Sequence, residues 1–141
     1  MKLLTRITAF VCLLIALAAH SADAVRTASP EGASLYIISP ADGDTVSDTC
    51  TVVFGLEGMG VAPAGTEKPN TGHHHLVVDG KELPSLNQPM GSDVKHFGGG
   101  QTQTTLTLPK GEHTLQLVLG DHNHVPHDPP VVSEVITVTV E

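Results

Sequence analysis

Apolar and polar residues alternate with a period of two through most of this chain, and no stretch after residue 24 shows the period of an amphipathic helix. The alternation is clearest from Thr49 to Glu57, where Cys50, Val52 and Phe54 fall on the same side. Turn residues interrupt the pattern roughly every 8–12 residues, as in small all-β domains. The chain is therefore predicted to be all-β, with an immunoglobulin-like antiparallel β-sandwich of about seven strands.

The alternating segments predict individual strands. These are Ser34–Ser39, Thr49–Glu57, His73–Val78, Thr102–Leu108, His113–Leu119 and Val132–Val140. Asp79-Gly80 is a dipeptide typical of hairpins, and Pro109-Lys110-Gly111 predicts a hairpin between the two segments that flank it. We expect a single domain over residues 34–141, preceded by an exposed leader at 25–33.

The N-terminus has the features of a secretory signal peptide. Lys2 and Arg6 precede an apolar run over residues 7–19, and Ala22-Asp23-Ala24 matches an A-x-A cleavage site. The apolar run is shorter than the roughly 20 residues that a membrane-spanning helix needs. We therefore expect residues 1–24 to be a cleaved signal peptide, the mature protein to be periplasmic or secreted, and no membrane span to remain.

The charge of the predicted mature chain excludes two classes of partner. From residue 25 onward five Lys and Arg face fourteen Asp and Glu, a formal net charge of about −9. Such a surface repels nucleic acid and anionic lipid.

Cys50 is the single cysteine of this part, so no internal disulfide is expected, and its place in an apolar strand predicts an inert buried thiol.

Histidine is the unusual component, because eight of the nine histidines follow residue 24. If consecutive strands alternate in direction, seven of the eight lie at one end of the domain and His113 lies at the other. The proposed metal ligands are His73, His75, His96, His122, His124 and His127, with His74 on the opposite face of its strand. Imidazole suits copper and zinc. Asp121 and Asp128 are expected to orient ring nitrogens, and the thioethers of Met59 and Met90 are candidate additional ligands for Cu(I).

Other interpretations of the histidines stay open at this point. They could cap strands and bind loop carbonyls, or form the interaction surface of a non-catalytic structural or adaptor protein that contacts another envelope protein. No nucleophile elbow, pair of catalytic carboxylates or H-E-x-x-H motif is visible, so no catalytic residue is predicted. A metalloenzyme with an open coordination position is a further alternative.

Several motifs together resemble a known family. They are Gly58-Met59-Gly60-Val61-Ala62-Pro63-Ala64-Gly65, Gly72-His73-His74-His75-Leu76, His96-Phe97-Gly98 with Gln101-Thr102, and His113-Thr114-Leu115-Gln116-Leu117 leading to Gly120-Asp121-His122, His124 and Pro126-His127. In these motifs the chain resembles domain-of-unknown-function family 4399, over about Leu35 to Val140. The resemblance implies a small exported bacterial protein with a single domain. It implies no catalytic residues, and the metal hypothesis comes from the histidines alone.

Overall fold

The computed structural model describes residues 22–141, and the predicted signal peptide lies outside this range except for its last three residues. Every regular element in residues 22–141 is a strand, which confirms the all-β prediction. This part of the chain accordingly has no helix long and apolar enough to cross a membrane. The strands are β1 (Ser34–Ser39), β2 (Thr45–Val46), β3 (Thr49–Glu57), β4 (Gly60–Val61), β5 (Thr71–Val78), β6 (Lys95–His96), β7 (Gln103–Thr107), β8 (Gly111–Gly120) and β9 (Ile136–Val140).

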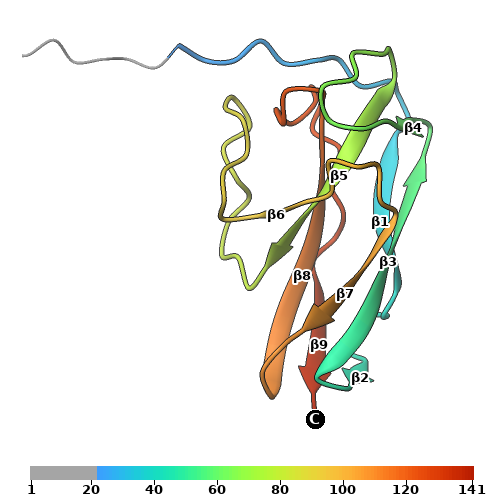
Figure 1. The fold of residues 1–141 in the computed structure, drawn as a ribbon, viewed down its shortest axis with the longest axis vertical. Coiled ribbons are helices and arrows are strands. Elements are labelled where there is room, and N and C mark those ends of the chain that lie inside the picture. Colours follow the sequence, from blue (N-terminus) through green and yellow to red (C-terminus); the bar gives the residue numbers. More distant parts are fainter. Residues whose placement is uncertain (1–21) are drawn as a thin grey trace, which may run out of the picture.

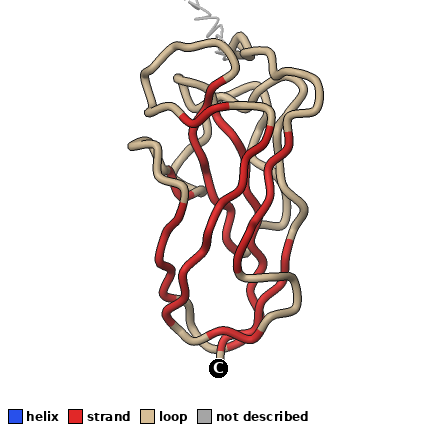
Figure 2. Tube along the Cα trace, turned by 90° about the vertical axis from the view of Figure 1, so that its right-hand side faces the viewer, coloured by secondary structure: helices blue, strands red, loops and turns tan. Residues whose placement is uncertain are grey.

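The strands form two sheets (Figure 1). One sheet has three strands in the order β1-β3-β7, and the other has six, in the order β2-β9-β8-β5-β4 with β6 paired to β5. The long strands run along the long axis of the molecule, and loops gather at the end opposite the C-terminus (Figure 2). Two layers of strands are therefore confirmed, while the immunoglobulin-like connectivity stays a prediction.

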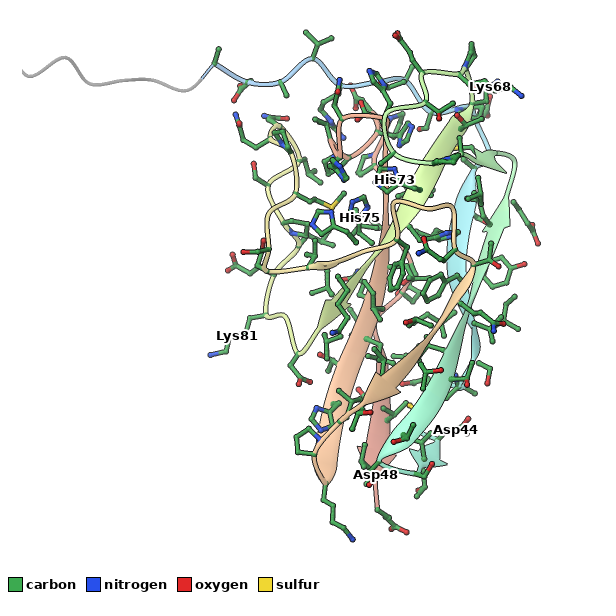
Figure 3. The ribbon with its side chains drawn as sticks, viewed as in Figure 1. Asp44, Asp48, Lys68, His73, His75 and Lys81 are labelled. Atoms are coloured by element: carbon green, nitrogen blue, oxygen red, sulfur yellow. The ribbon has the colours of Figure 1, made fainter. Side chains whose placement is uncertain are left out.

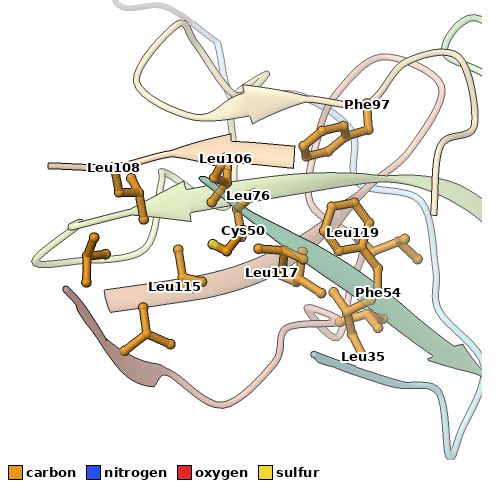
Figure 4. Packing of buried hydrophobic residues seen from close by; sticks show 14 residues of the cluster. Leu35, Cys50, Phe54, Leu76, Phe97, Leu106, Leu108, Leu115, Leu117 and Leu119 are labelled. Atoms are coloured by element: carbon orange, nitrogen blue, oxygen red, sulfur yellow. The ribbon is translucent and has the colours of Figure 1, made fainter. Parts of the chain in front are cut away.

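The two sheets enclose one hydrophobic core (Figure 4). Its members come from alternate positions of the facing strands, because successive side chains of a strand point to opposite faces. Leu115 and Leu117 of β8 are fully buried, and Val52 of β3 faces them from the other sheet. Cys50 lies in the same cluster at 8% exposure, as a free thiol. The predicted burial of the Cys50 thiol is thus confirmed.

The predicted hairpin at residues 109–111 is wrong. β7 pairs with β3, whereas β8 pairs with β5 and β9, so this turn carries the chain from one sheet to the other. Leu106 and Leu115 are buried in the same cluster, but they come from different sheets. A period of two shows which side chains are buried together, and it does not show whether two strands share a sheet.

The tight hairpin predicted at Asp79-Gly80 is also absent, because β5 pairs with the next strand, β6, only after the long connection over residues 79–94. The Asp79 carboxylate instead accepts hydrogen bonds from the backbone N–H of Thr114, at 3.0 Å, and from Nδ1 of His113, at 2.7 Å, which holds the end of β5 to β8. The chain then continues as residues 80–94, named here the covering segment, and returns as β6. Met90 and Val94 of this segment pack with Val118 on the outer face of the large sheet.

The last strand begins at Ile136, four residues later than predicted. Residues 131–133 still follow β8, since the Leu119 N–H bonds to the carbonyl of Val131 at 2.9 Å. At Ser133, however, the side-chain hydroxyl accepts the N–H of Leu117 at 2.8 Å, so a side chain replaces a backbone carbonyl in the ladder. This change of hydrogen-bond acceptor interrupts the regular strand.

Candidate metal centre

Three consecutive histidines in β5 alternate between the two faces of the large sheet. His74 points into the core, where its ring lies 5.0 Å from that of Phe54 and its Nδ1 donates to the carbonyl of Gln101 at 3.2 Å. His73 and His75 point to the outer face, toward the covering segment (Figure 3). Both are fully buried, and their Nδ1 atoms have no hydrogen-bond partner. The alternation predicted for these three residues is confirmed.

His96 joins the outer pair through strand pairing. In the β5–β6 ladder His96 lies directly opposite His75, so the two side chains project from the same face. The Nε2 atom of His96 donates to the carbonyl of Gly91 at 2.7 Å. A neutral imidazole has a single N–H, so this bond leaves the lone pair on Nδ1. That arrangement is typical of metal-binding histidines, which donate their second nitrogen to a carbonyl or carboxylate.

His124 comes from the loop after β8, which is folded around a buried carboxylate. Oδ1 of Asp121 accepts the N–H of Asn123 at 2.8 Å and that of Val125 at 3.0 Å, and Oδ2 accepts the hydroxyl of Thr27 at 2.7 Å. Burial alone would raise the pKa of Asp121, but these hydrogen bonds outweigh it and lower the pKa. His124 itself has φ of 64°, a left-handed conformation that is uncommon for a residue with a side chain. The loop thus holds the His124 ring over β5.

Three imidazole nitrogens surround a fourth, Nδ1 of His124. Nδ1 of His124 lies 3.0 Å from Nε2 of His73, 3.3 Å from Nε2 of His75 and 3.2 Å from Nδ1 of His96. A ring nitrogen has either one hydrogen or one lone pair in the ring plane, so it takes part in one good hydrogen bond. Hydrogen bonding can therefore account for one of these three contacts. A cation among the nitrogens would accept a lone pair from each of them.

The spacing of the nitrogens fits a coordinated ion. The edge of a tetrahedron is about 1.6 times the distance from its centre to a corner, so Zn–N bonds of about 2.0–2.1 Å place ligand nitrogens about 3.3–3.4 Å apart. The three distances to Nδ1 of His124 are 3.0–3.3 Å. One ligand atom from each of His73, His75 and His124 also lies within 4.8 Å of the others, whereas His96 lies outside this group and approaches through His124. Three of the rings are therefore spaced so that they could hold a metal ion, with His96 beside them.

The electrostatics keep the rings ready to bind a cation. Burial, with a smaller contribution from the neighbouring imidazoles, lowers the pKa of His73 to about 4 and that of His75 to about 3. Burial also lowers the pKa of His124. These rings are neutral at neutral pH and have lone pairs available. The Asp121 carboxylate raises the pKa of His73 and His124, but by less than burial lowers it.

The other two predicted ligands lie elsewhere. His127 is fully buried and faces backbone carbonyls, with Nε2 3.2 Å from the oxygen of Thr71 and Nδ1 3.4 Å from that of Leu119. His122 contacts the amide of Asn123 at 2.9 Å and has no contact with the four converging rings. His113 pairs with Asp79 at the far end of β8, as the predicted strand directions require.

The predicted accessory residues divide in the same way. Asp121 holds the loop backbone and does not bind a ring nitrogen, while Asp128 pairs with Arg26 at 3.4 Å. Met59 packs against the main core, whereas Met90 packs on the outer face beside the histidines.

The steric role of Gly120 was not predicted from the sequence. Its position at the end of an alternating strand, just before the loop with His122 and His124, could have indicated it. A Cβ there would lie 2.5 Å from Cε1 of His75. The absent side chain therefore makes room for the cluster.

Residues 52–141 match the model of the family described as Domain of unknown function (DUF4399). The chain is a DUF4399 protein. This confirms the resemblance seen in its motifs, and all four converging histidines of the DUF4399 domain lie inside the matched range. Comparison with curated proteins and with solved structures gave no significant match.

Proposed function

We propose that this protein is an exported metal-binding module that holds a copper or zinc ion through His73, His75, His96 and His124. The single observation that carries the proposal is the approach of three imidazole nitrogens, from His73, His75 and His96, to within 3.0–3.3 Å of Nδ1 of His124. The ligands come from three segments, β5, β6 and the loop after β8, on an immunoglobulin-like sandwich. The n-region, apolar run and A-x-A site support export to the periplasm or the medium.

The adaptor interpretation has less support. A protein-interaction surface needs accessible side chains at its centre, and aromatic or Arg residues are typical there. His73 and His75 are fully buried under the covering segment. His96 is exposed and His124 is half-buried, which is the exposure expected of a site that an ion enters from solvent.

Metal analysis and titration of the untagged protein test the proposal. We expect one equivalent of Cu(II) or Zn(II) per chain, and loss of that binding in the double variant His75→Ala/His124→Ala, because two of four ligands are removed. The circular dichroism spectrum should stay that of a β protein. The same preparation, isolated from an exported fraction, should begin at Val25 by mass.

His122→Ala is the matched control, since it removes an imidazole from the same loop without touching the cluster. It should bind the ion as the wild type does. Equal affinity in the double variant and the wild type would exclude the proposed ligands, and absence of stoichiometric binding by the wild type would exclude the function.

A further inference from the structure

A thioether lies beside the histidine cluster. Met90 belongs to the covering segment and is only 5% exposed. Its backbone N–H donates to the carbonyl of His124 at 2.9 Å, which fixes its position next to one of the four rings. The carbonyl of the next residue, Gly91, accepts Nε2 of His96. Two consecutive residues of the covering segment thus contact two of the proposed ligands.

The end of the Met90 side chain and the ring of His75 border the same space above Gly120. A Cβ on Gly120 would lie 2.8 Å from Cε of Met90 and 2.5 Å from Cε1 of His75. Both groups therefore occupy the space that the missing side chain of Gly120 leaves. Methionine has three rotatable bonds, so a change of rotamer can turn its sulfur toward the rings.

Packing alone does not require sulfur at this position. The neighbours of Met90 on the outer face are Val77, Val94 and Val118, and a leucine would fill that apolar site about as well. Thioether sulfur is a soft donor that selects Cu(I), whereas zinc and copper both accept imidazole. A buried methionine in contact with a polyhistidine site is therefore a feature that discriminates between the two metals.

The charge of the donor set favours a monovalent ion. Imidazole and thioether are neutral ligands, and the carboxylate of Asp121 already accepts hydrogen bonds from Thr27, Asn123 and Val125. The cost of transferring an ion from water into a buried site rises with the square of its charge. A site in which the buried rings of His73 and His75 supply no negative charge disfavours a dication more strongly than a monocation.

We propose that the ion bound by this protein is Cu(I), with the thioether of Met90 as an additional ligand beside the imidazoles. This inference rests on the proposed function and narrows it to one metal and one oxidation state. No bond is made or broken within the protein, and the ion is bound as it is supplied.

Competition titrations separate the narrower inference from the broader one. Anaerobic titration with Cu(I) against a chromogenic Cu(I) chelator, and a parallel titration with Zn(II), give the two affinities of each variant. We expect tighter binding of Cu(I) than of Zn(II) in the wild type. Met90→Leu should weaken Cu(I) binding by about tenfold or more and leave Zn(II) within about threefold. Met59→Leu, in the main core, should leave both affinities unchanged.

X-ray absorption at the copper edge of the wild-type Cu(I) complex gives a second measurement that needs no variant. A sulfur scatterer in addition to nitrogen supports Met90 as a ligand. A spectrum with nitrogen alone, together with equal Cu(I) affinities of the wild type and Met90→Leu, overturns this inference while the histidine site stands. Failure of the wild type to bind either Cu(I) or Zn(II) overturns the proposed function itself.

Discussion

Gly120 has no side chain, and this leaves room for the cluster of His73, His75, His96 and His124. It lies opposite His73 in the β5–β8 ladder, at the end of β8 and immediately before the loop that holds His124. Its backbone has no positive φ that would require glycine, so the requirement is steric. The space above it is occupied by the ring of His75 and the methyl group of Met90.

Gly120→Ala should therefore weaken metal binding without removing a ligand. The added Cβ would lie 2.5 Å from Cε1 of His75, and the ring has to move by several tenths of an ångström or more. Misplaced ligands lose affinity, so we expect a loss of about 10–100-fold in titrations with Zn(II) or Cu(I).

Gly60→Ala is the control for this substitution. Its Cβ would meet nothing closer than 3.5 Å, and its φ does not favour glycine, so affinity should stay at the wild-type value. A Gly120→Ala variant that binds the ion as tightly as the wild type would show that the His75 ring does not need the position described.

His113 has a different role from the clustered histidines. Its Nδ1 lies 2.7 Å from the carboxylate of Asp79, and its Nε2 lies 2.8 Å from the carbonyl of Pro109. Both nitrogens face acceptors, so the folded protein favours the imidazolium form. The bond to Asp79, with a smaller contribution from the carbonyl, raises the pKa of His113.

The His113–Asp79 pair should make stability depend on pH. A raised pKa in the folded state adds stability that is complete below the unfolded pKa of about 6.5 and is lost as the pH rises through the folded value. Asp79→Asn keeps an acceptor for the Thr114 N–H but removes the charge. The free energy of unfolding should therefore differ between wild type and variant by up to about 1 kcal/mol near pH 6, and by less at pH 9.

Urea denaturation at a series of pH values measures this difference. Because the Asp79 side chain is 51% exposed, the effect is small and should fall further in high salt. A difference between the two proteins that stays constant from pH 6 to pH 9 would contradict the assigned charge pair.

Among the elements, β5 connects the fold to the site. Its inner face contributes His74 and Leu76 to the region between the sheets, and its outer face contributes His73 and His75. One strand thus serves the core and the chelate together. The remaining proposed ligands come from β6, which pairs with β5, and from the loop that follows β8, the other neighbour of β5.

An ion at the site should hold these elements together. In the described chain the covering segment is fixed mainly by the short β6 pairing, by the Met90–His124 backbone bond and by its apolar contacts. We expect Zn(II) to slow amide hydrogen exchange in residues 80–96 and 121–125. At an ion concentration of 100 times the dissociation constant, the slowing should reach about 100-fold where exchange requires the site to open.

The exchange experiment has an internal reference. β1 and β3 lie in the other sheet, and their exchange should not respond to the ion. The variant His75→Ala/His124→Ala should show no slowing anywhere in the chain. Uniform slowing across both sheets would instead indicate global stabilisation, and the covering segment would then not be a separately opening unit.

At the scale of the whole molecule, the sequence predicted burial well and pairing poorly. The bounds of β1 and β3 follow from alternation and flanking turns, and both were predicted as the structure has them. The crossing at residues 109–111 was not predictable, because the leucines on either side bury the same faces in a hairpin and across a core. Tertiary context decides between these arrangements.

The site was predicted to a similar degree. Strand directions correctly separated His113 from the remaining histidines, and alternation separated His74 from its neighbours. The loop after β8 has no period, so the choice among His122, His124 and His127 depended on the left-handed conformation at residue 124 and on the bonds of Asp121. Those features arise only in the folded chain.

The spread of the four histidines along the chain also fixes an order of events. They span residues 73 to 124, so their rings come together only when β5, β6 and the loop after β8 have packed against one another. An unfolded chain holds these rings far apart, and its affinity for an ion is correspondingly low. On the proposed function, the chain therefore has to fold before it binds its ion, and occupancy of the site would report that folding is complete.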